Sequence, residues 1–385
     1  MACGTLILSS SFPRFKGDYA GHFVAESCPY YSARGPVTVL APDDAMVDNT
    51  FRMKECAITR FKPCFAKASS LFYGYGGPEN IRTSGGIFFA PLAFAAQCRA
   101  AHPLLKNAER VTAHWLVPSG LTAALFAPKG AKLQLVVHGG DWNWLKNNAM
   151  GRMIVRYVLR RADDVVVVAN YLREDLCGLF LPKERERMER EIRVLPMGLD
   201  VAHFAKGTRP SRQTRRVLAV GRLVPIKGFD RLIRALRGQA VEIRLVGEGP
   251  ERAKLETLAR RSGVPVCFLG RKSTEEMAAL YRESSILVLP SHGKNSRGEG
   301  LPRVLLEGMA AGCAVVATRC GGIGDVLRHG ENALLDDGDE TVLRDNITRL
   351  LDDPDEQLRL QEVAQRDALK YDWSVIGPKL ARTLA

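Results

Sequence analysis

Two glutamates stand eight positions apart in the segment RGEGLPRVLLEGMAAG, residues 297–312. Glu299 precedes an apolar stretch and Glu307 lies inside it. If the stretch is a helix, its rise of roughly 1.5 Å per residue separates the two carboxylates by about 10 Å. That separation suits two hydroxyl-bearing rings at the ends of one ligand, with a phosphate group between them. The alternative is a favourable charge near a helix N-terminus and a solvated Glu307.

The chain between the glutamates has the composition of a helix start that can bind an anion. Pro302 suits the first helical turn, where its missing N–H costs nothing. The backbone amides of Gly300, Leu301 and their neighbours are then free to face a phosphate. The run SILVLP, residues 285–290, predicts a strand shortly before this point. Ligands of open α/β sheets bind at such strand exits.

A second strand exit in the same half carries two cations. In VLAVGRLVPIKGFDRLIRAL, residues 217–236, the predicted strand ends at Gly221 and a short loop carries Arg222 and Lys227 before a further glycine and a helix. Two cations on one short loop could hold a diphosphate. The alternative is a pair of solvated surface charges.

One histidine of the first half also follows a predicted strand. His138 comes directly after the run KLQLVV and precedes two glycines and Asp141. It could face a ligand, or it could be a satisfied structural histidine. The sequence shows neither the spaced histidine and cysteine sets of zinc sites nor a D-x-D carboxylate pair at a strand exit. We therefore expect no metal, with the loop cations neutralising a departing diphosphate instead.

The residues named so far follow short apolar runs, which alternate with helical stretches along the chain. Their continuous apolar character is typical of parallel strands covered on both faces. Residues 198–214 are polar and lack periodicity, which indicates a linker between two doubly wound domains with a cleft between them. The predicted strands are residues 5–10, 37–42, 58–61, 110–115, 132–138, 164–170 and 192–196 in the first half, and 216–221, 242–247, 266–270, 285–290 and 314–318 in the second.

Composition sets further limits on the function. The chain has 385 residues, 46% of them hydrophobic and 25% charged, with a formal net charge of +13. No aromatic-interleaved basic stripe accompanies that charge, so we expect no nucleic-acid partner. The helix-spaced arginines 152, 156 and 160, with Arg161, form either a solvated helix face or a surface that approaches an anionic membrane. The nine cysteines include no C-x-x-C pair and are predicted to be buried, reduced thiols of a cytoplasmic protein.

Four motifs of the second half resemble the retaining glycosyltransferases of the GT-B architecture, in the family-4 (group 1) branch. They are GRLVPIKG (221–228), LVGEGPER (245–252), GEGLPRVLLEGMAAGCAVVAT (298–318) and GGIGDVLRHGENALL (321–335). The first half resembles the family more loosely, through SFPRFKGDYAGHFV (11–24), HWLVPSG (114–120), HGGD (138–141) and PMGLD (196–200). Asp325 departs from the family pattern, which has a glutamate there.

The resemblance implies a GT-B fold of two Rossmann-like domains that face each other across a cleft. Residues 1–200 would bind the acceptor, residues 205–370 would bind a nucleotide-sugar donor, and residues 371–385 would cross back onto the first domain. It also implies site roles. Glu307 would bind the ribose and Glu299 the donor hexose. Arg222 and Lys227 would hold the diphosphate with amides around Gly300, Leu301 and Pro302, and Gly17 would let the backbone approach it. His138 would face the sugar, Arg271 would frame the base, and Gly221 and Gly247 belong to the donor-binding motifs.

We therefore expect a retaining, metal-independent glycosyltransferase that moves a hexose from a nucleotide-diphosphate sugar to a hydroxyl group. The acceptor would be a glycan, a lipid-linked glycan or a small molecule. The enzyme would be cytoplasmic, and the anionic inner face of the membrane would be a further partner. The alternatives are a nucleotide-sugar epimerase or hydrolase of the same fold, and a non-catalytic sugar-nucleotide-binding subunit. No G-x-G-x-x-G follows the first strand of either half, which disfavours a dinucleotide dehydrogenase.

Overall fold

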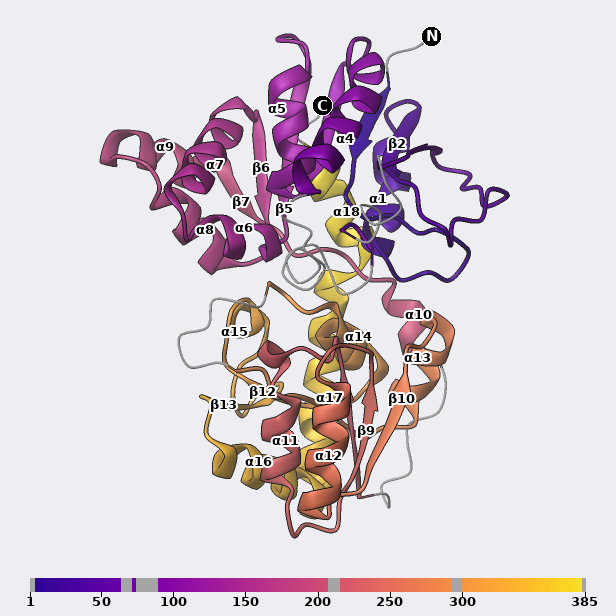
Figure 1. The fold of residues 1–385 in the computed structure, drawn as a ribbon. Helices are drawn as coiled ribbons and strands as arrows, with labels where there is room; N and C mark the ends of the chain where they lie inside the picture. The colour runs from indigo at the N-terminus through magenta and orange to yellow at the C-terminus, as the bar shows by residue number, and fades with distance from the viewer. Residues whose placement is uncertain (1–3, 64–70, 74–88, 207–214, 293–299, 383–385) are drawn as a thin grey trace. The chain divides into compact units, whose positions relative to one another are not determined.

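The computed structural model describes residues 4–63, 71–73, 89–206, 215–292 and 300–382. The chain forms two compact units, each with its own parallel sheet (Figure 1). The first unit comprises Met1–Gly198 and Ser374–Ala385, and the second comprises Leu199–Trp373.

The first unit contains a parallel sheet of seven strands in the order β3-β2-β1-β4-β5-β6-β7 within the described residues. The order reverses between β1 and β4, so the loops that leave these two strands diverge at a topological switch point. The strands are β1 (Thr5–Leu8), β2 (Val37–Pro42), β3 (Ala57–Phe61), β4 (Arg110–His114), β5 (Lys132–Val137), β6 (Asp164–Val167) and β7 (Ile192–Val194). The helices are α1 (His22–Ser32), α4 (Ala90–Leu105), α5 (Leu121–Phe126), α6 (Gly140–Leu145), α7 (Ala149–Arg161), α8 (Asn170–Cys177) and α9 (Pro182–Glu191).

The C-terminal helix α18 (Trp373–Ala381) belongs to the first unit from Ser374 onward. It packs so closely that a Cβ atom on Gly377 would lie 2.3 Å from Cγ of Tyr30 in α1. The Gln134 amide of β5 donates a hydrogen bond of 2.8 Å to the carbonyl of Leu380. Segments at opposite ends of the chain therefore build one core.

The second unit contains a parallel sheet of six strands in the order β10-β9-β8-β11-β12-β13 within the described residues. The order again reverses, between β8 and β11. The strands are β8 (Arg216–Val220), β9 (Glu242–Val246), β10 (Val266–Gly270), β11 (Ile286–Leu289), β12 (Ala314–Thr318) and β13 (Leu334–Asp336). The helices are α10 (Val201–Ala205), α11 (Phe229–Ala235), α12 (Arg252–Ser262), α13 (Thr274–Arg282), α14 (Arg303–Ala311), α15 (Ile323–Val326), α16 (Glu340–Asp352) and α17 (Pro354–Ala368).

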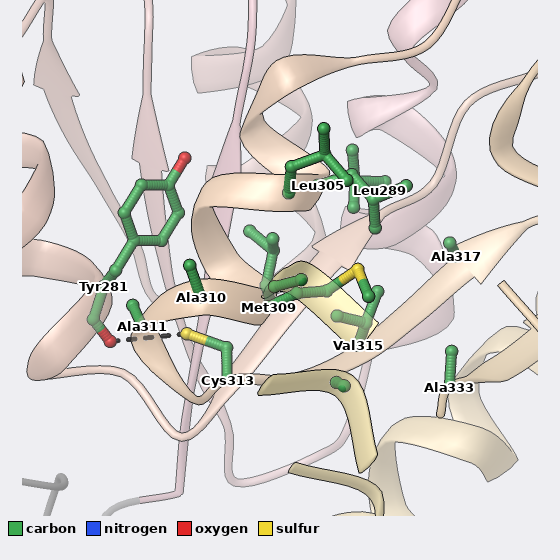
Figure 2. Packing of buried hydrophobic residues seen from close by; sticks show 14 of the residues in the cluster. Tyr281, Leu289, Leu305, Met309, Ala310, Ala311, Cys313, Val315, Ala317 and Ala333 are labelled. Atoms are coloured by element: carbon green, nitrogen blue, oxygen red, sulfur yellow. Dashed lines mark hydrogen bonds between the residues drawn. The ribbon is translucent and has the colours of Figure 1, made fainter. Parts of the chain in front are cut away.

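Successive residues of β8 enter two different cores, because a strand points alternate side chains to opposite faces. Leu218 and Val220 belong to one buried cluster and Val217 and Ala219 to the other. Figure 2 shows the first cluster, in which Leu305 and Met309 of α14 lie among Leu289 and Val315 of the sheet. The Cys313 thiol there donates a hydrogen bond of 3.3 Å to the carbonyl of Tyr281. This packing fixes α14 against one face of the sheet.

The predicted fold class is confirmed, since both sheets are parallel and covered by helices. Most strands end one to three residues before the predicted boundary, because the last predicted residues already turn away from the sheet. The short strand β13 was missed by the prediction, which had only the three residues LLD to detect there.

Two expectations were wrong. Cys267 was predicted to be buried, but it is exposed because it lies on β10, the edge strand of the second sheet. Residues 198–214 were predicted to be a linker, but Val201–Ala205 form α10. Leu199, Val201 and Phe204 are buried in the core of the second unit, so ordered structure continues through the predicted linker to this point.

Candidate functional site

Three neighbouring strand exits of the second unit are locked together by glycines. The amide of Gly221, after β8, donates to the carbonyl of Val246 at 2.9 Å. Gly247, after β9, has φ of 139°, and a Cβ atom there would lie 1.9 Å from the Gly221 carbonyl oxygen. The amide of Gly247 in turn donates to the carbonyl of Gly270 at 2.8 Å. No other residue fits at position 247, which explains why a glycine stands there.

The cation-bearing loop lies directly above this glycine floor. The aliphatic stem of Lys227 covers Gly221, since a Cβ atom on that glycine would lie 3.4 Å from Cε of the lysine. Arg222 is exposed and Lys227 is half-buried. Gly228, with φ of 63°, has so little space that a Cβ atom would lie 2.0 Å from the carbonyl oxygen of Pro290. The two predicted cations thus stand at the exit of β8, against the chain that leaves β11.

A buried ion pair, which the sequence analysis missed, fixes these exits from below. Arg231 of α11 donates to the carbonyls of Pro290 and Ser291 at 2.9 and 3.1 Å. Its other guanidinium nitrogen lies 2.9 Å from a carboxylate oxygen of Asp336, and these side chains are 4% and 0% exposed. Thr318 also donates to that carboxylate at 3.1 Å. The exits of β11, β12 and β13 are thereby held in one arrangement.

His292 links the same loops at the surface. Its amide donates to the carbonyl of Ile226 at 2.9 Å, and its ring nitrogen Nε2 lies 3.2 Å from Oδ1 of Asp230. Partial burial raises the pKa of Asp230, but His292 and Arg234 outweigh it and hold that pKa below its usual value. His292 therefore contacts a carboxylate of its own unit.

Two neighbouring side chains position Glu307 on α14. The hydroxyl of Tyr281 donates to Oε2 at 2.9 Å, and Nε of Arg303 lies 3.7 Å from Oε1. The glutamate side chain is 15% exposed. Burial first, and the negative charge of Glu307 second, raise the pKa of Tyr281 well above its ordinary value. The tyrosine therefore remains a hydrogen-bond donor and fixes the Glu307 side chain in one orientation.

A helix starts at the predicted place, but Pro302 was predicted to lie in its first turn and is instead the N-cap residue, because its backbone is extended and α14 begins at Arg303. Leu301 packs against the core. The carbonyl of Gly300 accepts a hydrogen bond of 3.1 Å from Gly322, just before α15. Glu299, predicted to bind the donor sugar, lies outside the described residues. Arg271 is exposed directly after Gly270 at the exit of β10.

The second unit thus brings a glycine floor, two cations and a helix start to the carboxyl edge of one sheet, and a fixed carboxylate, Glu307, lies on the helix that begins there. Cations and free helix-start amides bind phosphate groups. An ionised carboxylate accepts hydrogen bonds from two neighbouring hydroxyls. This combination can hold a molecule that carries both a diphosphate and a sugar diol.

In the first unit, His138 lies at the exit of β5 among aromatic rings. Its ring centroid is 4.8 Å from that of Phe23 and 4.9 Å from that of Trp115. Its Nε2 atom lies 3.0 Å from Nδ1 of His114, and the two imidazoles are stacked at 10°. The next residue, Gly139, has φ of 95°, and a Cβ atom there would lie 2.9 Å from the hydroxyl of Tyr171.

Burial shifts the pKa values of this cluster. It lowers the pKa of His114 to about 3, and with the adjacent His114 it lowers that of His138 well below the usual value. Both rings are therefore neutral at physiological pH. Burial also raises the pKa of Asp141 to about 6, although this carboxylate accepts hydrogen bonds from the amides of Leu116, Val117 and Trp142.

Gly17 lies in the loop that leaves β1. It has φ of 86° within a turn closed by a hydrogen bond of 3.1 Å from the amide of Asp18 to the carbonyl of Phe15. The Asp18 carboxylate is paired with Arg14 at 2.7 Å, and both side chains are buried. The strained backbone at position 17 is therefore held by a rigid ion pair. Gly17 and His138 belong to the first unit, and the other described site predictions belong to the second.

Sequence reasoning missed the residues that support the site: Tyr281, Arg231, Asp336 and His114. Only His114 and Arg231 stand within segments that the sequence analysis quoted. No local pattern marks the role of Arg231, Tyr281 or Asp336, because their partners lie far along the chain. Tyr281 and Glu307 are 26 positions apart and Arg231 and Asp336 are 105 apart.

Comparison with known proteins gives a consistent family. A model of "Glycosyl transferases group 1" matches residues 203–367, and a model of "Glycosyl transferase 4-like domain" matches residues 22–189. An uncharacterized glycosyltransferase of Methanocaldococcus jannaschii is 29% identical over 68% of this chain and 71% of its own length. A GDP-mannose-dependent α-(1-6)-phosphatidylinositol monomannoside mannosyltransferase of Mycobacterium tuberculosis is 30% identical over 56% of this chain and 60% of its own length.

Among solved structures, Anabaena HepE in complex with UDP superposes with a TM-score of 0.73 at 20% identity, covering 99% of both chains. At that identity the likeness establishes the fold. The two family models together span most of both sheets and both candidate strand-exit regions. The chain therefore belongs to the group 1 glycosyltransferases with the GT-B fold.

Proposed function

We propose that this protein is a retaining, metal-independent hexosyltransferase that uses a nucleotide-diphosphate sugar. The observation that supports the proposal is the Glu307 carboxylate, fixed on α14 by Tyr281, in the same unit as the cation-bearing exit of β8. Lys227 and Arg222 bind the diphosphate, and the start of α14 adds backbone amides. Glu307, oriented by Tyr281, accepts hydrogen bonds from the ribose hydroxyls. Glu299 would bind the hexose, an assignment that rests on the family resemblance alone.

Metal independence is supported by the chemistry of the same loop. Two side-chain cations and a helix start supply the positive charge that a departing diphosphate requires. EDTA should leave turnover unchanged, and added Mg²⁺ or Mn²⁺ should not stimulate a dialysed enzyme. Loss of activity in EDTA that a divalent cation restores would contradict this part of the proposal.

For stereochemistry we propose retention by a front-face reaction. The departing phosphate takes the proton of the acceptor hydroxyl while that oxygen bonds to the anomeric carbon on the same face. His138 lies at the exit of β5 and, as a neutral imidazole, would contact the donor hexose. Proton NMR of the first-formed product gives the anomeric configuration. Inversion, or a trapped covalent glycosyl-enzyme, would contradict the proposal.

The donor nucleotide can be found without knowing the acceptor. The mycobacterial relative is described as GDP-mannose-dependent, whereas HepE was solved with UDP. A thermal-shift panel of GDP, UDP, ADP and their hexose conjugates should show one base with the largest stabilisation, because a ligand of the folded state raises Tm by mass action. Turnover of that donor with and without acceptor pools separates transfer from epimerisation or hydrolysis. Binding without any turnover would favour a non-catalytic subunit.

We propose in addition that the first unit approaches an anionic membrane through the surface formed by α5 and α7. Met150, Met153 and Tyr157 are 62%, 57% and 43% exposed and share one side of α7. Leu125 and Phe126 of α5, 48% and 41% exposed, extend the apolar area. The Tyr157 hydroxyl donates to the carbonyl of Ala124 at 3.2 Å, so the two helices are in contact.

Charge beside this α5–α7 surface favours lipid over a neutral partner. Helix α7 carries four arginines and no acidic residue. Arg156 and Arg160 are exposed beside the apolar side, although Arg160 is paired with Glu184 at 2.6 Å. Exposed apolar side chains flanked by arginine are typical of helices that lie in an anionic interface. Within the described part of the chain, every helix is too short or too polar to cross a bilayer.

Vesicle sedimentation tests this surface. The protein should sediment with phosphatidylglycerol vesicles at low salt and much less with phosphatidylcholine. A Met150→Ser/Met153→Ser variant should lose most of the binding, whereas Val342→Ser, which changes an exposed residue of the second unit, should not. Equal sedimentation of the double variant and the wild type would contradict the assignment.

A further inference from the structure

The strongest unused feature is a buried histidine beside His138. His114 ends β4, is 0% exposed and stacks on His138. Its Nδ1 atom lies 3.0 Å from Nε2 of His138. Its other nitrogen, Nε2, is buried without a hydrogen-bond partner among the described residues. Such an arrangement needs an explanation, because buried polar atoms are normally satisfied.

The contact between the rings allows only one shared proton. In a bond between two neutral imidazoles, one facing nitrogen donates and the other accepts. If His138 donates from Nε2, His114 accepts at Nδ1 and must carry its own proton on Nε2, where a buried N–H would have no acceptor. If His114 donates from Nδ1, its Nε2 is a lone pair instead. Orphaned buried N–H groups are rarer than unsatisfied acceptors, so the second arrangement is favoured.

We infer that His114 is a positioning residue that sets the tautomer of His138. His114 donates from Nδ1, His138 accepts at Nε2, and the proton of His138 is therefore on Nδ1. His138 is then a neutral imidazole whose Nδ1–H can donate a hydrogen bond, which under the proposed function would go to the donor hexose. The inference about activity rests on the proposed function, whereas the tautomer is a property of the protein alone.

The neighbouring structure fixes the geometry that this requires. Trp115 follows His114 with φ of 69°, a conformation that a bulky residue rarely adopts and that the surrounding contacts must hold. Its ring contacts His138, and its amide donates to Val136 at 2.9 Å. The Asp141 carboxylate accepts from the amides of Leu116 and Val117, so it holds the chain directly after Trp115. Phe23 of α1 also contacts the imidazole, and its ring centroid is 5.9 Å from that of Trp115.

Nitrogen-15 NMR of the histidine rings tests the tautomer on the unliganded wild-type protein. His114 should show a protonated Nδ1 and an unprotonated Nε2, and His138 should show the same pattern. Assignment uses the His114→Asn and His138→Asn variants. A protonated Nε2 on either residue would overturn the inference, whether or not the protein transfers sugar.

Two substitutions at position 114 separate hydrogen bonding from packing. His114→Phe keeps a stacked ring but removes the donor, whereas His114→Asn removes the ring but places an amide N–H near the position of Nδ1. We expect His114→Phe to lower kcat about tenfold with little change in the donor KM, the loss expected for one hydrogen bond. His114→Asn should retain more activity than His114→Phe even if its Tm is lower.

The reverse order would show a purely structural role and overturn the inference. His102→Phe, an exposed histidine of α4, is the control and should match the wild type. Should His114→Phe fail to fold, the NMR result and the His114→Asn kinetics still decide. A wild-type protein that transfers no sugar from any donor would count against the proposed function and would leave the NMR test of the tautomer intact.

Discussion

The strand exits of the two units use opposite chemistry. In the second unit, the exit of β8 carries two cations, a buried ion pair holds the neighbouring exits, and Tyr281 fixes the Glu307 carboxylate of α14. In the first unit, the exits of β4 and β5 present two neutral histidines among aromatic rings. Under the proposed function, this difference is a division of work: charge would hold the donor in the second unit, and neutral, oriented groups would act on the sugar in the first.

The largest effect is expected from Glu307→Ala. It removes a fixed carboxylate and leaves the Tyr281 hydroxyl buried without its acceptor. Two hydrogen bonds to a charged group together contribute about 4 kcal/mol, so kcat/KM should fall on the order of 10³-fold. Nucleoside diphosphate affinity, measured by calorimetry, should fall with it. Glu256→Ala, on the outer face of α12, is the matched control, and equal affinity in both variants would remove Glu307 from the site.

Gly247→Ala tests the glycine floor. The new Cβ atom would lie 1.9 Å from the carbonyl oxygen of Gly221 at a φ of 139°, so we expect a loss of about 3 kcal/mol in the free energy of unfolding. Gly263→Ala is the control, since φ is 66° there but nothing lies within 4 Å. It should cost only about 1 kcal/mol. Urea denaturation measures both, and equal losses would show that the contact between the exits of β8 and β9 is unimportant.

His138→Asn should separate the two units most clearly. We expect kcat to fall about 100-fold, because an oriented imidazole beside the reacting sugar is lost. The affinity for nucleoside diphosphate should stay within about twofold, because the groups that bind phosphate are in the second unit. Calorimetry with the preferred diphosphate, beside steady-state kinetics, measures both. A large loss of affinity with unchanged kcat would reverse the assignment.

The first unit should become less stable as pH falls, and the second much less so. Unfolded histidines take up protons below about pH 6.5, whereas His114, with a pKa of about 3, and His138 stay neutral in the folded unit, so acid favours unfolding. Asp141 acts in the opposite sense, because its folded pKa of about 6 exceeds its unfolded value of about 3.8. Between pH 7.5 and 5.5 we expect a net loss of about 2 kcal/mol.

Urea titrations at the two pH values, followed by tryptophan fluorescence, measure this loss. In His138→Asn about half of the histidine contribution should disappear. A wild-type protein whose stability is the same at both pH values would show that the histidines are accessible to protons in the folded unit.

Sequence patterns predicted the fold because its strands are continuous apolar runs with glycine or proline after them. The strand exits of the second half, which carry glycine and charged residues, also placed Gly221, Lys227 and Glu307 together in one unit, as the structure has them. The patterns failed where the burial of a residue depends on the position of its strand in the sheet. Cys267 is exposed because β10 has a neighbour on one side alone among the described strands, which no local pattern records.

Side chains that support the site could not be predicted for a related reason. Arg231 and Asp336 form a buried ion pair, but they lie in separate segments, so neither segment reveals the pair. His114 lies in an apolar strand, where a histidine ordinarily signals a packed core. Its stacking on His138 depends on the adjacency of β4 and β5 in the sheet. Tertiary pairing, rather than local spacing, selects these residues.

Helix α18 has a consequence for biosynthesis. Since Gly377 packs on Tyr30 and Leu380 accepts a hydrogen bond from Gln134, the first unit cannot close until residues 374–381 have left the ribosome. The second unit, continuous from Leu199 to Trp373, is complete earlier. N-terminal domains usually fold first during synthesis. Here the first unit finishes folding only after the second. A released chain truncated before Ser374 should hold a finished second unit and an unsealed, protease-sensitive first unit.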